Sequence, residues 1–346
     1  MAITLAEAKV GMADKVDQQV VDEFRRSSLL LDSLVFDNSI SPGTGGSTLT
    51  YGYMQLKTPS TAGVRAINTE YTPSEAKREK KSSEAIVMGG AFEVDRVIAN
   101  TSGAVDELAF QAQQKIKATA NYFSNVVING TSATSGSGYV VKTFDGLKKL
   151  LAGSDTEVAA EADLSTSALT DTNYNAFLDE LDSFISLLDG KPTMLLMNNK
   201  MLTKLRACAR RAGYYKKELN EFGKQVEYYD DIPLMDCGKY YDAAAQKSVD
   251  IIETTAASAS AYGTTSIYAV TIGLDGFHGI SPTGTGVISS YMPDLTAPGA
   301  VKKGDVELIA GVVLKNTRKA GVLKGIKIEP KTTSQGVRPY GRTGVN

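Results

Sequence analysis

The chain has 346 residues, enough for two or more compact units, and 42% of them are hydrophobic, as in proteins that bury substantial cores. Its 37 Lys and Arg against 39 Asp and Glu give a net charge of −2, which creates no overall field to gather phosphates and argues against DNA binding by the whole surface. No stretch approaches the roughly 20 apolar residues that cross a bilayer, and the first residues lack the pattern of a signal peptide, so we expect a soluble protein with no membrane partner.

The first expected element is an amphipathic helix over about residues 14–35. Its apolar residues recur near helical spacing: Val16, Val20, Phe24, Leu31 and Val35. The pattern fits a helix that packs on its own core and equally a helix that docks onto a neighbouring copy. A Gly-rich stretch at residues 43–46 then separates this N-terminal segment from the next unit.

An extended β-hairpin is expected over residues 47–94. Residues 47–57 and 84–94 are rich in β-forming side chains, and the stretch between them is polar and mixed in charge. Such an arm has little core of its own, and isolated hairpins are marginal in water, so it must lie against another surface. We therefore expect contacts between subunits at Tyr51, Tyr53, Arg65, Glu70, Glu75, Lys77, Arg78, Lys80 and Lys81.

A long helix follows over about residues 103–128, where apolar residues keep to one stripe. Its length corresponds to a rod of about 36 Å. Asn129 and Gly130, which tolerate left-handed conformations, end it. The Gly/Ser/Thr-rich loop at 131–138 lacks the spacing of a phosphate-binding loop.

Residues from about 170 onward read as an α/β unit. A helix with a regular apolar stripe ends at Asp189-Gly190, a buried strand spans 193–197, and Asn198 is placed to cap a second helix. The second helix carries a basic face, usually a solvated surface, that offers two further contact candidates, Arg206 and Arg210. Further strands are expected at 226–229, 233–237, 266–272, 306–314 and 322–329. The polar tail over 332–346 supplies the last contact candidate, Arg338.

Few residues can support catalysis. His278 is the only histidine, the G-x-S-x-G motif is absent, and we expect this histidine to be structural, loop-placed or solvent-facing. Asp230 and Asp231 fit a turn between strands better than a metal site, because adjacent strand residues point to opposite faces. Cys208 and Cys237 lie in apolar company and are expected to be inert core thiols. We predict no catalytic residue, no cofactor and no metal.

The order of these elements resembles the Hong Kong 97-type capsid fold, an α+β fold found in the major capsid proteins of tailed bacteriophages. The resemblance is carried by Phe92-Glu93-Val94-Asp95-Arg96-Val97-Ile98, Val127-Ile128-Asn129-Gly130, Phe144-Asp145-Gly146-Leu147, Asp231-Ile232-Pro233-Leu234 and Ile267-Tyr268-Ala269-Val270. It implies these divisions: 1–46 an N-terminal arm; 47–94 an E-loop hairpin; 95–169 a peripheral domain with the spine helix at about 103–128; 170–285 an axial domain; 286–346 the return strands of the peripheral domain and the C-terminal tail.

The resemblance also implies a function. The chain would form pentamers and hexamers of an icosahedral shell, its E-loop lying over a neighbour, around double-stranded DNA that is confined rather than gripped. No charged helical region precedes the N-terminal arm, which implies a separate scaffolding protein or a cleaved precursor, beside a portal and a possible decoration protein. Assembly would take place in a bacterial cytoplasm, and the product would be a virion.

Three alternatives stay open at this point. The first is an encapsulin, in which the same fold encloses a protein cargo. The second is another phage structural protein, such as a tail-tube subunit. The third is an enzyme that uses His278, Asp230 and Asp231.

Overall fold

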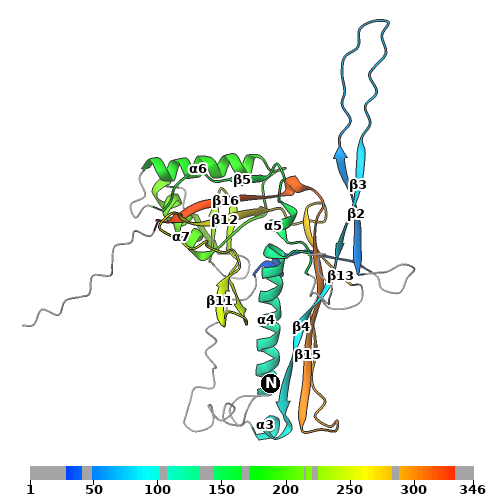
Figure 1. Ribbon diagram of the computed structural model, residues 1–346, viewed down its shortest axis with the longest axis vertical. Coiled ribbons are helices and arrows are strands. Elements are labelled where there is room, and N and C mark those ends of the chain that lie inside the picture. Colours follow the sequence, from blue (N-terminus) through cyan, green and yellow to red (C-terminus); the bar gives the residue numbers. More distant parts are fainter. Residues whose placement is uncertain are drawn as a thin grey trace, which may run out of the picture.

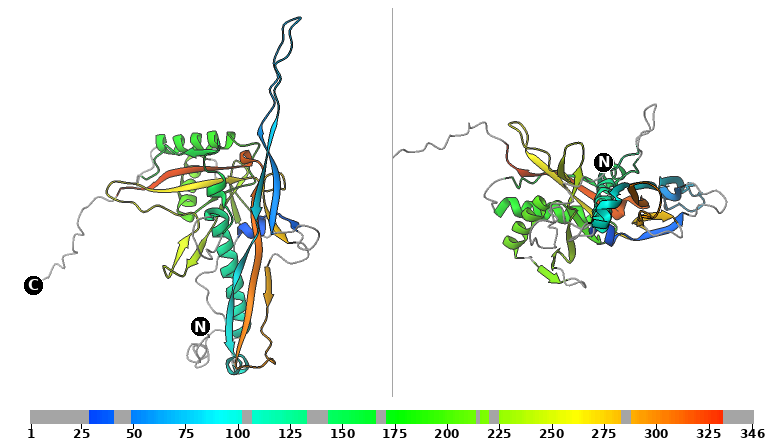
Figure 2. Two further views of the ribbon diagram at one scale, coloured as in Figure 1. Left: turned by 45° about the vertical axis from the view of Figure 1, so that its right-hand side comes forward. Right: turned by 90° about the horizontal axis from the view of Figure 1, so that it is seen from below.

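The computed structural model describes residues 29–40, 49–101, 107–132, 143–165, 171–213, 216–219, 225–282 and 288–331. Figure 1 shows two main bodies: an upright unit in which one long helix stands beside two long strands, and a second unit of a sheet with two helices. A narrow two-stranded ribbon projects beyond both, and the left view of Figure 2 shows the same projection.

The upright unit is built on one five-stranded sheet. Its strands are β1 (Phe36–Ile40), β4 (Ile86–Asp95), β13 (Phe277–Pro282), β14 (Ile288–Tyr291) and β15 (Val301–Leu314). The longest pairing joins β4 and β15, which run antiparallel from Ile86 opposite Ala310 to Asp95 opposite Val301. β13 pairs antiparallel with residues 311–314 of β15, and β14 pairs antiparallel with residues 305–308, which β4 also pairs with. β1 pairs parallel with β13.

Helix α4 (Glu107–Asn129) lies along β4 and β15 and closes one face of this sheet. Its C-terminal half is the more deeply buried, with Phe123, Val127 and Ile128 at 0–1% exposure, because there it enters the core between the two units. The short helices of this region are α2 (Leu29–Ser33), α3 (Arg96–Thr101) and α5 (Leu147–Leu150). Gly130 and Gly146 lie so close that a Cβ on either would meet backbone atoms, so α4 ends where α5 approaches.

The second unit contains a seven-stranded sheet. In spatial order its strands are β5 (Glu157–Ala159), β16 (Ala320–Glu329), β12 (Gly263–Val270), β6 (Met194–Met197), β9 (Ile232–Asp236), β8 (Gln225–Tyr229) and β7 (Lys216–Leu219). Helices α6 (Asp171–Ser186) and α7 (Asn199–Ala212) pack on it. A small hairpin of β10 (Lys239–Asp242) and β11 (Lys247–Asp250) and the 3₁₀ turn η2 (Thr317–Lys319) complete the unit.

Strand β6 explains how the two units share a core. All four of its residues are buried, and its side chains alternate between the faces of the sheet. Leu195 and Met197 face the cluster under α6 and α7, while Met194 and Leu196 face the cluster that contains the end of α4. A strand buried on both faces needs an unbroken apolar run, which is what residues 194–197 supply.

The ribbon, which we call the β2–β3 arm (residues 50–84), pairs β2 (Thr50–Thr58) with β3 (Lys77–Glu84). This corrects the hairpin expected from the sequence, in which 84–94 was the returning strand. Residues 86–95 instead form β4 and pair with β15, and the charged run 77–84 returns beside β2. The charged run 77–84 carries no alternation of apolar residues that would mark it as a strand. A strand of a solvated ribbon buries neither face and so needs no such alternation.

Three other expectations are corrected or limited. The predicted divisions put β13 in the axial domain and β16 in the peripheral domain. In the structure β16 pairs with β12 in the seven-stranded sheet, whereas β13 pairs with β15 in the sheet of the upright unit, so both assignments were wrong. Within the predicted helix 14–35, the described helical part is Leu29–Ser33, and Val35 lies outside it. The rest of that helix, and residues 102–106 of the long one, lie outside the described residues.

Candidate assembly surfaces

The β2–β3 arm exposes nearly all of its length. Residues 56–82 are exposed without exception, and β3 has the burial of a strand in open solvent. Within the described residues the arm packs on the body at its base alone, where Tyr51 and Tyr53 lie against a small cluster of Ala85, Ile280 and Val313. The distal arm therefore has no core within its own subunit.

Three hydrogen bonds fix the base of the arm to the upright unit. The Tyr51 hydroxyl donates to Asp37 Oδ2 at 3.2 Å, Gln55 Nε2 donates to the Lys315 carbonyl at 3.1 Å, and Ser83 Oγ donates to the Val312 carbonyl at 2.7 Å. The ammonium of Lys315 also lies 5.6 Å from the centre of the Tyr51 ring, within cation–π range. These contacts set the direction in which the arm leaves the body.

The tip of the arm is held by local bonds. Ser74 Oγ accepts from Thr61 N at 2.7 Å, linking the two sides. Arg65 donates to the Thr69 carbonyl at 3.2 Å, and its guanidinium lies 5.4 Å from the centre of the Tyr71 ring. Val64 and Ile67 are 104% and 90% exposed. An ordered tip that displays apolar side chains fits a surface that another molecule covers.

The two faces of the ribbon differ in character. On one face, Met54 and Leu56 of β2 are exposed, and they lie opposite Lys80 and Arg78 of β3, respectively. The sequence analysis missed these apolar residues, although the alternation over 51–56 puts Tyr51 and Tyr53 on one face and Met54 and Leu56 on the other.

The remaining arm candidates, Glu70, Glu75, Lys77 and Lys81, are all exposed. Lys57 and Glu79 form an ion pair of 3.5 Å, but both are solvated and contribute little to stability. The charges of the arm are thus available to a partner.

The candidates on α7 behave differently from one another. Arg206 makes a two-pronged contact with Glu227, Nε to Oε2 at 3.0 Å and Nη2 to Oε1 at 2.9 Å. This pair joins α7 to β8 inside the subunit, so Arg206 has a structural role. Arg210 is exposed, and Arg338 lies outside the described residues.

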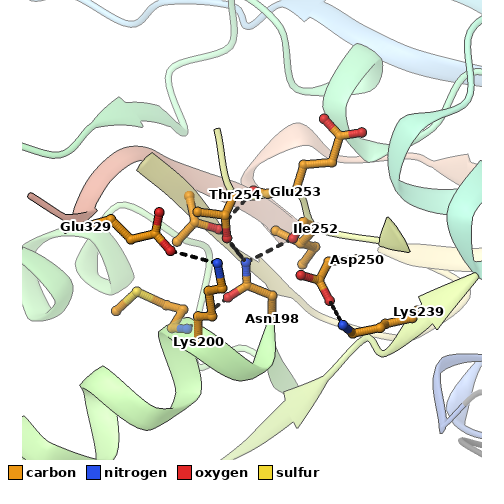
Figure 3. A network of polar contacts seen from close by, with 10 residues as sticks. Asn198, Lys200, Lys239, Asp250, Ile252, Glu253, Thr254 and Glu329 are labelled. Carbon is orange, nitrogen blue, oxygen red and sulfur yellow. Dashed lines mark hydrogen bonds and ion pairs between the residues drawn. The ribbon is translucent and has the colours of Figure 1, made fainter. Parts of the chain in front are cut away.

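A polar network anchors the start of α7 (Figure 3). Asn198 is 1% exposed; its Oδ1 accepts from Met201 N at 2.8 Å, which caps the helix as predicted. Its Nδ2 has two N–H groups to donate and lies within hydrogen-bond distance of three acceptors: the Ile252 carbonyl at 2.9 Å, Thr254 Oγ1 at 3.0 Å and Thr265 Oγ1 at 2.9 Å. Lys200 pairs with Glu329 at 2.7 Å, and Lys239 pairs with Asp250 at 3.4 Å, on either side of Asn198. One buried amide thus joins α7, β12 and the segment after β11.

His278 is fully buried in β13, opposite Val313 of β15, which corrects the loop-placed or solvent-facing alternatives. Tyr51 meets its ring edge-on, with centroids 6.0 Å apart. Among the described residues, neither ring nitrogen has a hydrogen-bond partner of normal geometry. Burial, helped by the positive charge of Lys315, lowers the pKa of His278 below 6.5, with nearby backbone and Asp37 opposing. The ring therefore belongs to the junction beneath the arm, where β13 meets Tyr51 at the base of the β2–β3 arm.

The other chemical candidates are also structural. Asp230 and Asp231 occupy a two-residue turn between β8 and β9, both with positive φ (45° and 59°), as in a type I′ hairpin turn. Cys208 and Cys237 are buried and unbonded to each other, and burial raises the pKa of the Cys208 thiol to about 11 and also raises that of Cys237. Within the described residues no group of three His, Cys, Asp or Glu is placed to hold a metal ion. None of the described helices is long and apolar enough to cross a membrane.

Comparisons with known proteins agree with this architecture. Residues 81–232 match the family model of the SU10 major capsid protein. The chain is similar to the holo-SrpI encapsulin complex from Synechococcus elongatus PCC 7942, with a TM-score of 0.64, 14% identity, and coverage of 97% of this chain and 100% of that chain. No curated protein matches the chain.

Phage structures give the same result. The capsid of Myoviridae phage XM1 matches with a TM-score of 0.51 and 14% identity over 94% of this chain and 99% of that chain. A chain from Mycobacterium phage Bobi matches with a TM-score of 0.55 and 11% identity over 96% and 100%. The predicted α+β fold of the Hong Kong 97 type is confirmed. The family matched over residues 81–232 is that of a major capsid protein, the kind of protein predicted from the sequence.

Proposed function

We propose that this chain, a capsid shell subunit of the Hong Kong 97-type fold, is the major capsid protein of a tailed bacteriophage and builds the icosahedral shell around its double-stranded DNA. The observation that carries the proposal is the β2–β3 arm, whose residues 56–82 are exposed throughout. A long ribbon with exposed Met54, Leu56, Val64 and Ile67 is stable in a subunit only if a neighbour covers it.

Assembly follows from surfaces that every copy presents. An arm that lies on the next subunit makes a head-to-tail contact, and head-to-tail contacts close into rings when the rotation between copies allows it. Homo-oligomeric assembly into a shell is the consequence, with pentamers and hexamers as its rings. Cations on β3, such as Lys80 and Lys81, would set the register on the neighbour, because charge complementarity selects partners more than it adds affinity.

The wider set of partners belongs to the same proposal. We assign to the chain a separate scaffolding protein, a portal and possible decoration proteins as assembly partners, in the cytoplasm of a bacterial host. The virion is the finished location. Packaged DNA would be confined by the wall, in keeping with a net charge of only −2.

An encapsulin-type shell is the second candidate, favoured by the likeness of the whole chain to an encapsulin. The two functions require the same arm and the same closed particle. They differ in what the particle encloses, and the match of residues 81–232 to the family model of a major capsid protein favours the first.

The test is expression of the chain alone and together with the products of its neighbouring genes, followed by negative-stain microscopy. Closed particles of uniform size are the expected result. Rods would indicate a tail-tube protein, and a stable monomer under all conditions would overturn the shell function. Nuclease-protected DNA inside particles from infected cells supports the phage capsid, whereas a protein cargo supports the encapsulin.

A further inference from the structure

The paired strands β4 and β15 cover only one of their two faces. Even-numbered residues of both strands, among them Phe92, Val94 and Val306, are buried against α4. The odd-numbered residues point the other way and are exposed or half-buried. We call this second surface the open face; it consists of the odd-numbered residues 87–95 of β4 and 301–309 of β15.

The centre of the open face combines two carboxylates with two very small residues. Glu307 of β15 lies opposite Gly89 of β4, and Asp305 lies opposite Ala91. The carboxylates therefore follow one strand, and the other strand carries only a hydrogen atom and a methyl group at the same levels. This leaves space beside the two negative charges.

The residues around these two carboxylates do not neutralise them. On the outer side of β15, Ser289 and Tyr291 of β14 lie opposite Glu307 and Asp305, and both are uncharged. The cation of the open face is Lys303, but it lies opposite a different carboxylate, that of Glu93. The centre of the open face is thus negative.

One face of the β2–β3 arm carries the complementary pattern. Met54 lies opposite Lys80, and Leu56 lies opposite Arg78. Met54 and Leu56 are 67% and 58% exposed, and both cations are exposed as well. On this surface, which we call the Met54 face, the cations follow one strand and the large apolar side chains follow the other.

The spacing of the two patterns also matches. Residues two positions apart on a strand lie about 7 Å from each other on the same face. This is the separation of Arg78 from Lys80 on β3, and equally of Asp305 from Glu307 on β15. When the two ribbons are stacked with β3 over β15 and β2 over β4, each cation meets a carboxylate. The two large apolar side chains then lie over the two small residues, the alternation that lets facing layers pack closely.

We propose that the Met54 face of the arm binds the open face of a neighbouring copy, where its two cations meet the carboxylates of Asp305 and Glu307. The proposal rests on the shell function and names the surface that receives the arm. The exposed ion pairs set the register of the contact, and burial of the apolar side chains stabilises it.

The occupant is the arm of a second copy because a subunit's own arm points away. Figure 1 shows the arm leaving the body in the direction opposite to the β4–β15 ribbon. Ala85, which joins β3 to β4, is 4% exposed, and its N–H donates to the Leu49 carbonyl at 2.7 Å, so the junction is held in this direction. A contact between the arm of one copy and the open face of the next is head-to-tail, as ring closure requires.

The first test exchanges charges across the contact. Arg78→Glu with Lys80→Glu, or Asp305→Lys with Glu307→Lys, should each lower the yield of particles about tenfold or more, because like charges then face each other. All four changes in one chain restore opposite charges and should return the yield to within about twofold of the wild type. Sedimentation measures the yield, and thermal unfolding of the unassembled subunit shows that each variant folds.

The matched control puts the reversed charges on the other face of β3. Lys77→Glu with Lys81→Glu makes the same change of charge, but these residues alternate with the cations of the Met54 face. The control pair should not restore assembly to the chain with Asp305→Lys and Glu307→Lys. A wild-type yield from either reversal alone, no rescue by the four changes, or equal rescue by the control pair would overturn the proposal.

The second test is independent of variants that fail to assemble or fold. A full-length chain with Leu56→Cys and Ala91→Cys carries one thiol on each face, and the native thiols are buried. A short bismaleimide added to particles should join different copies into dimers and larger species on a denaturing gel. Glu79→Cys with Ala91→Cys is the control, because Glu79 is exposed on the other face of the arm.

The outcomes of cross-linking separate this proposal from the shell function. Equal linking in the control, links confined to one chain, or no links at all would overturn the contact between the Met54 face and the open face. Particles that form without these links leave the shell function intact. A wild-type chain that never forms particles would overturn the shell function and this proposal together.

Discussion

At the scale of the residue, Asn198 shows how one buried amide can hold several segments together. Its oxygen accepts from the first turn of α7, and the two N–H groups of its nitrogen are shared among three acceptors on other segments. Buried polar groups stabilise a structure only when their partners are complete, and a partly satisfied group costs more than an apolar one. Every group in this cluster therefore depends on the others.

We predict that Asn198→Ala lowers the free energy of unfolding by about 3 kcal/mol, because it removes a helix cap and leaves buried acceptors without donors. Urea unfolding of the unassembled subunit measures the change. Asn199→Ala, one residue along and exposed, is the control and should change stability by less than about 0.5 kcal/mol. Asn198→Asp keeps the cap but loses both N–H donors, so a stable Asn198→Asp would contradict the importance of the bonds that Nδ2 donates.

His278 gives the junction beneath the arm a dependence on pH. Its pKa in the folded subunit is lower than 6.5, so the unfolded chain binds protons more readily. The contribution of His278 to the free energy of unfolding is fully present above about pH 6.5 and is lost as the pH falls toward the pKa of the folded state. The charged groups around it are Lys315, which lowers its pKa, and Asp37, which opposes.

The prediction is that the thermal midpoint falls more steeply between pH 7.5 and pH 5 in the wild type than in His278→Phe, which keeps a ring against Tyr51. Differential scanning fluorimetry on both proteins over that range gives the comparison. Parallel curves for the two proteins would show that the pKa of this histidine is the same in the folded and the unfolded chain.

At the scale of the element, the β4–β15 ribbon depends on backbones that approach closely. A Cβ at Gly89 would lie 1.9 Å from the Val306 carbonyl oxygen, and its φ of 156° is one that residues with side chains rarely adopt. Only glycine therefore allows the two strands their full length of pairing.

Gly89→Ala should destabilise the subunit by about 2 kcal/mol or more, because backbone atoms cannot yield as a flexible side chain would. Gly63→Ala has open space around it and no unusual φ, and should be neutral within about 0.5 kcal/mol. Thermal unfolding of the two variants side by side measures the difference. Equal midpoints would mean that the strands tolerate displacement at this point.

Shortening the β2–β3 arm should abolish assembly while leaving the folding of the subunit intact. Thr58 lies opposite Lys77, so replacing residues 59–76 by Asn-Gly gives a hairpin of favourable geometry. The removed residues are all exposed, so the thermal midpoint should stay within about 2 °C while particle formation is lost. Val64→Ser with Ile67→Ser is a milder version that keeps the length of the arm. Normal particles from the shortened arm, by microscopy and sedimentation, would remove the arm from the assembly mechanism.

At the scale of the whole molecule, a shared core joins the two units while the arm stands apart from both. The cluster around Phe123, Leu196 and Tyr268 combines side chains from α4, β6 and β12, so the two units meet through buried apolar contact. The arm contributes its base alone. The subunit is thus a firm body with one long extension.

Hydrogen exchange before and after assembly should show this division. Amides of residues 56–82 are expected to gain protection of at least about tenfold in particles, because a neighbour then covers them. Amides of β12 and β16 should be protected in both states, as parts of the central sheet. Equal exchange of the arm in subunit and particle would place the contact between copies elsewhere.

Elements whose signals are local could be predicted from the amino-acid sequence. The stripe of α6, the apolar run of β6, the Asn198 cap and the Asp230-Asp231 turn each depend on side chains within a few residues of one another. The order of these elements was also enough to predict the fold and the shell function.

The pairing of strands and the contacts between distant groups depend on the fold of the whole chain and could not be predicted from local patterns. The side chains of residues 86–95 are compatible with pairing to β2 and with pairing to β15. Which pairing forms depends on the position of β15, a strand about 200 residues further along the chain. β16 joins β12, and His278 lies under Tyr51, for the same reason. Periodicity reports whether a face is buried, but the partner that buries it is set by the whole chain packing at once.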